Sequence, residues 1–189
     1  MEPHTIENPP ENDGGDLFSI AALKHSDGRK VDLALSEIVN RLRQRGYRLA
    51  GAVRARTAPS GENHCDLFLE DLSSATVHPM SQNLGAGSHA CRLDDGALDA
   101  IAAKVEASLQ DGADILILNK FGKQEAEGRG LRGPIVDAVN KGIPVLVGLN
   151  PVRTQDWNDF CGAGGELFGP DDDAVDRWLE AVLPNAPRS

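Results

Sequence analysis

The residues best placed to do chemistry follow an aliphatic run near the middle of the chain. The segment ILILNKFGKQEAEGRGL, residues 115–131, passes from four aliphatic residues directly to Asn119 and Lys120 and then to a cluster of further charges. In open α/β sheets, ligands bind at the carboxyl ends of parallel strands. Glu125 is therefore a candidate general acid or base, and Arg129 a candidate anion clamp. The alternative is a strand that ends in a solvated loop, whose surface ion pairs contribute little.

A second candidate site lies in the segment KHSDGRKVD, residues 24–32. A phosphate-binding loop has the pattern G-x-x-x-x-G-K-[ST], in which glycines let backbone amides surround phosphate and the hydroxyl binds magnesium. In that register the lysine position is kept, but the glycines and the hydroxyl are replaced by Lys24, Arg29 and Val31. A polar turn before a helix is the alternative. We take these residues as candidate anion-binding groups: Lys24, Ser26, Gly28, Arg29 and Lys30.

The end of the aliphatic run departs from the same pattern where a metal would be held. In enzymes with a phosphate-binding loop, a carboxylate on a second segment holds magnesium. Here Asn119 carries no charge, and Lys120 would repel a divalent cation and attract an oxyanion. Together with Val31, these substitutions predict weakened metal-dependent hydrolysis and a site that still binds an anion.

The glycine-rich segment NLGAGSHACRLD, residues 83–94, is a third candidate. Gly85 and Gly87 can adopt left-handed backbone, so that successive amides, together with Ser88, form an anion-binding nest. Cys91 has cationic neighbours in the sequence, which lower the pKa of a thiol and make it a candidate metal ligand. The alternative is a turn that leads into a helix, with Cys91 as a small buried residue.

The hydrophobic pattern predicts the elements that position these residues. Apolar runs at 17–23, 48–53, 113–118 and 143–149 are typical of strands, and the last two are apolar enough to be buried on both faces of a sheet. Residues 54–78 have the short runs and turns of antiparallel strands at a sheet edge. Helical spacing of apolar residues predicts helices over 31–42, 98–109, 131–139, 157–160 and 175–182. The sequence therefore predicts one α/β domain of three layers, with a mainly parallel sheet and an antiparallel edge hairpin.

Composition narrows the function classes. A net charge of −10 argues against nucleic-acid or anionic-membrane binding, and no run approaches the roughly 20 apolar residues of a membrane span. We expect residues 1–16, which are acidic and rich in proline and glycine, to be a disordered leader, and residues 17–185 to be the domain. Three widely spaced cysteines are typical of reduced thiols and predict a cytoplasmic protein.

The segments described above resemble those of a bacterial family of uncharacterised domains that is often encoded beside molybdate-uptake genes. The resemblance is carried by IAAL, SQNLGAGSHACRLD, ADILILNKFGKQEAEGRGLR, GIPVLVGL and WNDF, and it extends from residue 17 to about residue 169. It implies a role in molybdenum handling, with a protein partner in that process or a homo-oligomer.

More distantly, the order of elements is similar to that of small nucleoside-triphosphatases of the P-loop superfamily. Their pattern after the central strand matches Asn119, Lys120, Gly122 and Glu125. This resemblance implies a P-loop-like fold.

We therefore expect a degenerate P-loop-like domain that binds a small anionic ligand, a nucleotide or an oxyanion such as molybdate or tungstate, with little or no hydrolysis. Lys30, Lys120 and Arg129 would supply the positive charge. Three alternatives stay open. One is a magnesium-dependent nucleoside-triphosphatase in which Glu125 activates water, the second is a thiol-based carrier of a metal or metal cluster through Cys91, and the third is an adaptor that keeps only the scaffold.

Overall fold

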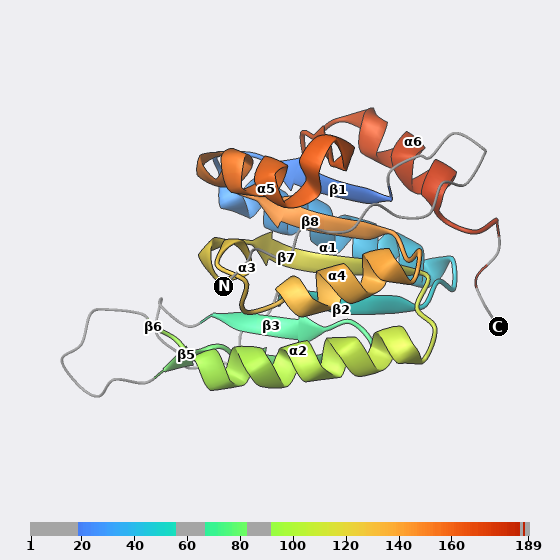
Figure 1. Ribbon diagram of the computed structural model, residues 1–189. Coiled ribbons are helices and arrows are strands. Elements are labelled where there is room, and N and C mark those ends of the chain that lie inside the picture. Colours follow the sequence, from blue (N-terminus) through green and yellow to red (C-terminus); the bar gives the residue numbers. More distant parts are fainter. Residues whose placement is uncertain (1–18, 56–66, 83–91, 186, 188–189) are drawn as a thin grey trace.

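The computed structural model describes residues 19–55, 67–82, 92–185 and 187. In this part of the chain a seven-stranded sheet has the order β4-β3-β2-β7-β8-β1-β9 (Figure 1). Strands β2, β7, β8, β1 and β9 are parallel to one another. At one edge, β3 pairs antiparallel with β2, and β4 pairs antiparallel with β3. The strand bounds are β1 Ile20–Lys24, β2 Leu49–Arg54, β3 Phe68–Asp71, β4 Thr76–Pro79, β7 Ile115–Phe121, β8 Val145–Leu149 and β9 Glu166–Phe168.

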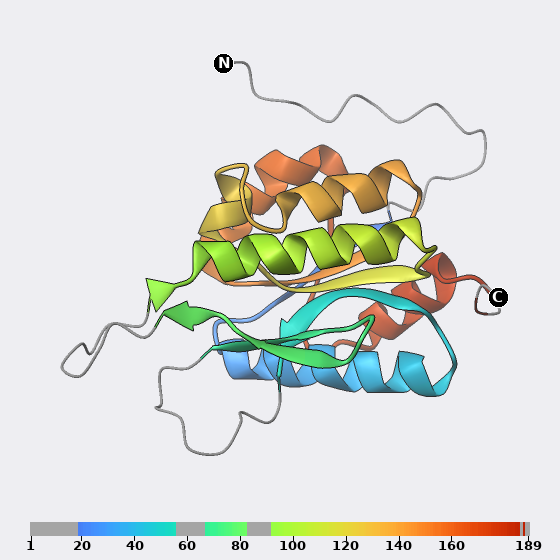
Figure 2. The ribbon, with the colours of Figure 1, turned by 90° about the horizontal axis from the view of Figure 1, so that it is seen from below.

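Helices cover both faces of this sheet. The α-helices are α1 Gly28–Gln44, α2 Asp95–Gln110, α3 Lys123–Ala126, α4 Arg132–Asn140, α5 Thr154–Cys161 and α6 Asp173–Val182, and the 3₁₀ turns are η1 Pro151–Arg153 and η2 Gly162–Gly164. Helices α1 and α6 pack on one face, and α2, α4 and α5 pack on the other (Figure 2). The predicted fold class, a three-layer P-loop-like α/β domain with an antiparallel edge hairpin, is confirmed.

The central strands are buried on both faces because their side chains alternate between two apolar cores. On β7, Leu116 and Leu118 belong to the core shared with α2, α4 and α5. Ile115 and Ile117 belong to the core shared with α1 and α6. Side chains alternate between the two faces of a strand, so Asn119, two residues after Ile117, points towards α1. The uniformly apolar sequence of β7 thus results from a strand that has no solvated face.

Most of the elements predicted from periodicity are present, and the differences are in short segments. The predicted loop after residue 80 has a short antiparallel pair at its ends, β5 Ser81–Gln82 with β6 Arg92–Leu93. The short elements β9 and α3 have no hydrophobic period long enough to be detected in the sequence. The leader predicted over residues 1–16 lies outside the described residues.

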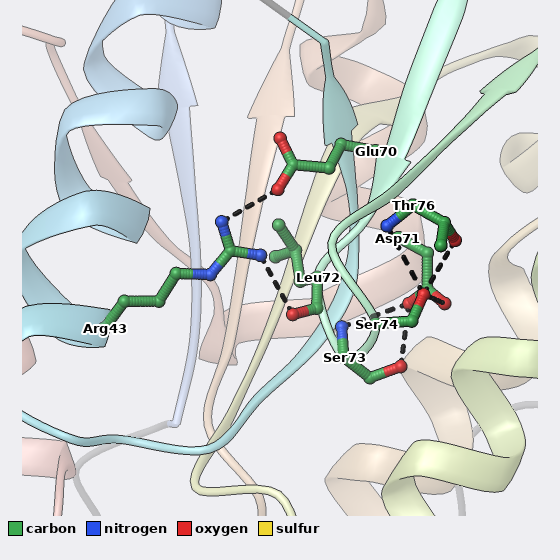
Figure 3. Close-up of polar contacts among 7 residues, drawn as sticks. All are labelled: Arg43, Glu70, Asp71, Leu72, Ser73, Ser74 and Thr76. Atoms are coloured by element: carbon green, nitrogen blue, oxygen red, sulfur yellow. Dashed lines mark hydrogen bonds and ion pairs between the residues drawn. The ribbon is translucent and has the colours of Figure 1, made fainter.

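Hydrogen bonds join the edge hairpin of β3 and β4 to α1, and a buried carboxylate accepts hydrogen bonds from its turn (Figure 3). Arg43, near the end of α1, donates to Glu70 Oε1 at 2.7 Å and to the carbonyl oxygen of Leu72 at 2.9 Å. Asp71, which is 2% exposed, accepts hydrogen bonds from the amide and hydroxyl of Ser73 and from the hydroxyl of Ser74. These contacts hold the hairpin as an extension of the parallel sheet. Within the described ranges, no helix is both long and apolar enough to cross a membrane.

Candidate functional site

A cavity of about 530 Å³ opens at the carboxyl ends of β2, β7 and β8, next to the first turn of α1. This is the edge of the sheet where open α/β folds bind ligands. Its polar lining comes from His25, Asp27, Gly28, Arg29, Asp32, Arg54, Asn119, Lys120 and Asn150. Its apolar lining comes from Val31, Leu67, Leu69 and Leu149, and Gly148 completes the floor. The cavity therefore combines charged groups with an apolar wall, as small-molecule sites commonly do.

The loop between β1 and α1 is short and carries its own helix cap. Only His25, Ser26 and Asp27 separate the strand from the helix. The Asp27 carboxylate accepts from the amide of Arg29 at 3.0 Å, and the Asp27 amide donates to Nδ1 of His25 at 2.9 Å. Aspartate is among the preferred N-cap residues because its carboxylate satisfies a free amide at the positive end of the helix dipole. The Asp27 carboxylate thus accepts from an amide that a phosphate-binding loop would leave free for its ligand.

A β-bulge on β7 places Asn119 and Lys120 at the cavity. The register with β8 shifts between Leu118 and Phe121, so β7 contains an extra residue at this point. The peptide bond between Asn119 and Lys120 is cis. Bulges change the direction of side chains and are frequent beside active sites. Here the bulge lies at the end of the strand, where both residues contribute to the lining of the cavity.

The most definite polar contact in the cavity joins β7 to α1. Asn119 Nδ2 donates to Asp32 Oδ1 at 2.6 Å across 87 positions of sequence. The Asp32 side chain is 23% exposed, and its second oxygen lies 3.9 Å from Nε of Arg54. Asp32 therefore places one fixed carboxylate in the cavity, held by an amide on one side and a guanidinium on the other.

Gly148 on β8 allows α1 to approach the sheet closely at this point. A Cβ atom there would lie 2.9 Å from Cγ1 of Val31 and 3.1 Å from Oδ1 of Asn119. Separations this short would force the helix or the Asn119 side chain to move. The glycine thus maintains the geometry that brings Asp32 and Asn119 together.

Among the described residues, three cationic side chains line the cavity: Arg29, Arg54 and Lys120. Arg54 is shared with Asp32, whereas Arg29 and Lys120 make no ion pair in the described part of the chain. A guanidinium and an ammonium without internal partners are suited to binding an anionic group. Positive charge in the cavity is consistent with the anion site predicted from the sequence.

The structure brings together some of the predicted site residues and separates others. Gly28, Arg29, Asn119 and Lys120 all line the cavity. Other predicted residues, Lys24, Ser26 and Lys30, are absent from its lining. Lys30 instead lies 3.8 Å from Asp171, and both of these side chains are largely exposed.

Glu125 and Arg129 also lie away from the cavity. Glu125 is 5% exposed, and its two oxygens accept from the amides of Gly122 at 2.9 Å and Leu131 at 3.0 Å. Arg129 pairs with Glu127 at 2.5 Å and lines a separate hollow between α2 and α4. In this geometry Glu125 closes the backbone turn around α3, and Arg129 belongs to a surface ion pair.

The glycine-rich candidates, Gly85, Gly87, Ser88 and Cys91, lie outside the described residues, so their predicted roles stay predictions. The described ranges contain no cluster of three or more histidine, cysteine, aspartate or glutamate side chains that could hold a metal ion. Cys161, which lies within these ranges, is half-buried on α5, and loss of solvation raises the pKa of its thiol to about 12. At neutral pH that thiol stays protonated and is a poor nucleophile.

Sequence reasoning missed several groups that line the cavity, and one signal was available for some of them. Arg54 and Asn150 stand at the ends of β2 and β8, so the rule applied to β7, that ligands bind at carboxyl ends, would have found both. Asp32 and Leu69 had no such signal. Their position depends on how α1 and β3 pack against the ends of the central strands.

Comparisons with known proteins add the following findings. Over 159 residues the chain is 28% identical to a Bradyrhizobium diazoefficiens protein named "Molybdenum import ATP-binding protein ModC 2". The match covers 84% of this chain but 18% of that protein, so the chain spans less than a fifth of its relative. No solved structure matches the chain. A family model described as "Protein of unknown function (DUF2478)" matches residues 20–178, and the chain therefore belongs to that family.

Proposed function

We propose that this chain is a degenerate P-loop-like domain that binds a nucleotide or an oxyanion and hydrolyses it little or not at all. The observation that carries the proposal is the cavity at the carboxyl ends of the parallel strands, where Arg29 and Lys120 have no ion-pair partner among the described residues. The similarity to an ATP-binding protein supports a nucleotide among the candidate ligands.

Each polar group has a distinct role in the proposed site. Arg29 approaches from the first turn of α1 and Lys120 from the end of β7, so the two cations can hold one anionic group from different directions. Arg54 adds a guanidinium whose charge is partly offset by Asp32. Asn119 fixes the orientation of the Asp32 carboxylate through their hydrogen bond.

Little hydrolysis is expected because the groups that hold a metal and activate water do not fit. Val31 and Asn119 stand where P-loop enzymes place a hydroxyl and a carboxylate for magnesium, and neither supplies a charged oxygen. Glu125, the acid predicted from the sequence, has both oxygens committed to backbone amides outside the cavity. A general base must reach the proton that it removes, and this one does not.

The proposed biological setting is molybdenum uptake. The support is the name of the similar Bradyrhizobium protein, which refers to molybdenum import. In a strain that lacks the gene, we expect lower cellular molybdenum at limiting molybdate, measured by mass spectrometry of washed cells. An unchanged molybdenum content across a range of molybdate supply would remove this setting while leaving the binding site to be judged separately.

Calorimetry and thermal shifts of the full chain test the binding proposal directly. ATP, AMP, sulfate, molybdate and tungstate are titrated with and without magnesium, because a ligand at 100 times its dissociation constant stabilises a protein by about 2.7 kcal/mol. At least one anion should bind without magnesium, and Lys120→Ala and Arg29→Ala should each weaken it by about tenfold. Lys141→Ala, which removes a cation from the exposed end of α4, is the matched control.

Two results would contradict the proposal. If no anion in the panel binds, or if Lys141→Ala weakens binding as much as Lys120→Ala, the cavity is not an anion site. If magnesium-dependent phosphate release from ATP rises above the uncatalysed rate and is lost in Arg29→Ala, the domain is a working hydrolase.

A further inference from the structure

The cavity differs from a phosphate-binding loop in where it can accept negative charge. In such loops the anion sits on free amides at the helix N-terminus. Here the Asp27 carboxylate accepts from the Arg29 amide at 3.0 Å, and a second negative group at that point would be repelled. An incoming anion must therefore be held by the side chains of Arg29, Arg54 and Lys120 rather than by the end of α1.

The net charge of the lining limits the charge of the ligand. Among the described residues, three cations and two carboxylates, Asp27 and Asp32, face the cavity, and these leave an excess of one positive charge when His25 is neutral. A phosphate monoester carries about −1.5 to −2 charges at neutral pH. A triphosphate carries several more, and Val31 and Asn119 stand where P-loop enzymes place the hydroxyl and the carboxylate that hold its magnesium. The charge balance favours a monophosphate.

The size and apolar wall of the cavity require more than an inorganic anion. Its volume of about 530 Å³ lies in the range of roughly 300–1,000 Å³ that is typical of sites for organic molecules. Leu67, Leu69 and Leu149 belong to its lining and are called the leucine wall here; Leu67 is partly exposed, whereas Leu69 and Leu149 are 4% and 1% exposed. A tetrahedral oxyanion would leave the exposed part of this wall, mainly Leu67, in contact with water, whereas a ring that packs on Leu67 would remove that apolar surface from water.

The Asp32 carboxylate distinguishes an inorganic oxyanion from an organic phosphate that carries hydrogen-bond donors. One oxygen accepts from Asn119 at 2.6 Å, and the carboxylate remains an acceptor with further lone pairs. Sulfate or molybdate has no proton to donate at neutral pH, so Asp32 can only repel it. A ribose hydroxyl or the amino group of a base can donate to Asp32 and turn that repulsion into a hydrogen bond.

We infer that the cavity binds a nucleoside monophosphate, with its phosphate on Arg29, Arg54 and Lys120, a donor group on Asp32 and an apolar ring face on the leucine wall. This inference rests on the proposed function and specifies its ligand class. It excludes free oxyanions and magnesium-bound triphosphates as the preferred ligands.

Competition calorimetry on the full chain tests the inference with AMP, GMP, CMP and UMP against magnesium-ATP, ribose 5-phosphate, sulfate and molybdate. The best nucleoside monophosphate should bind at least about tenfold more tightly than magnesium-ATP, ribose 5-phosphate or either oxyanion. Asp32→Asn should weaken the monophosphate by about tenfold while leaving sulfate unchanged or tighter. Asp176→Asn, on α6 and outside the cavity, is the control for loss of one carboxylate, and circular dichroism verifies that each variant is folded.

The outcomes separate the two proposals. Molybdate or sulfate that binds as tightly as the best monophosphate, and competes with it, overturns the inference but leaves an anion-binding domain. Tighter binding of magnesium-ATP overturns the inference in favour of a triphosphate site. Failure of every compound to bind overturns both the inference and the proposed function.

Discussion

Two carboxylates stand near the carboxyl end of β7, and they serve different regions of the molecule. Glu125 lies in the α3 turn, where both of its oxygens accept backbone amides within six positions of sequence. Asp32 lies in the cavity, where its amide partner Asn119 is 87 positions away. The sequence draws attention to Glu125 because it stands in a charged segment after a buried strand, yet the structure commits that residue to its own backbone.

The comparison shows that a carboxylate whose oxygens accept nearby backbone amides stabilises the fold and has little capacity left to bind a ligand. Glu125 is 5% exposed and lines no described cavity, whereas Asp32 is 23% exposed at the side chain and faces one. Removal of the first should therefore affect stability, and changes near the second should affect ligand and ion binding. Asp71 provides a second case of the first kind.

Glu125→Ala should give the largest loss of stability. It leaves the amides of Gly122 and Leu131 without their acceptor in a largely buried turn, at about 1–3 kcal/mol for each unsatisfied donor. Urea unfolding should show a loss of about 2–6 kcal/mol, with ligand affinity per folded molecule unchanged. Glu127→Ala, in an exposed ion pair two residues away, is the control and should change stability little. Loss of binding without loss of stability in Glu125→Ala would reverse the comparison.

Asn119→Asp tests how an added negative charge in the cavity changes stability and the binding of divalent cations. It replaces an amide donor with a carboxylate beside Asp32 and should destabilise the ligand-free protein by about 1–3 kcal/mol. Because two adjacent carboxylates can bind a divalent cation, millimolar magnesium or calcium should restore part of that loss in thermal unfolding. Asn158→Asp, on the exposed side of α5, should show neither effect. An Asn119→Asp variant as stable as the native chain without metal would mean that Asp32 is not held in the observed contact.

Asp71→Asn should give a pH-dependent loss of stability. Burial would raise the pKa of Asp71, but hydrogen bonds from Ser74 and Ser73 outweigh it and hold the pKa below its usual value of 3.8. A depressed pKa stabilises the folded state above the ordinary pKa, and the benefit is lost as pH falls through the folded value. The variant should lose about 1–2 kcal/mol at neutral pH. Urea unfolding near about pH 3 should show a smaller difference from the native chain. A constant difference across this range would contradict the assignment.

Cys161 should give the smallest effect, because its half-buried thiol has a pKa raised to about 12. At slightly alkaline pH it should react with iodoacetamide far more slowly in the native chain than in urea, as followed by mass spectrometry of its peptide. Cys161→Ala should change ligand affinity little, since the residue lies away from the cavity. Rapid native alkylation would show that this face of the molecule opens in solution.

The fold was largely predictable because long periodic segments record burial directly. The apolar faces of α1, α2, α4 and α6 and the uniformly apolar β7 and β8 appear in the sequence as helical spacing and as continuous aliphatic runs. The short elements β9 and α3 could not be predicted, because three or four residues carry no period and their geometry depends on packing. The candidate site was only partly predictable, since Arg29, Asn119 and Lys120 were identified but Asp32 and Arg54 were not.

The sequence by itself determined the layers of this protein and the order of its helices and strands along the chain. It could do so because these properties depend on local periodicity. Only the tertiary structure decided which charges share a cavity. Asp32, Arg54 and Lys120 come from segments far apart in the chain, and their proximity follows from strand order, the β7 bulge and the close approach of α1 at Gly148. The same packing turned Glu125 inward to its own backbone, because a buried carboxylate is stable there only when amides satisfy it.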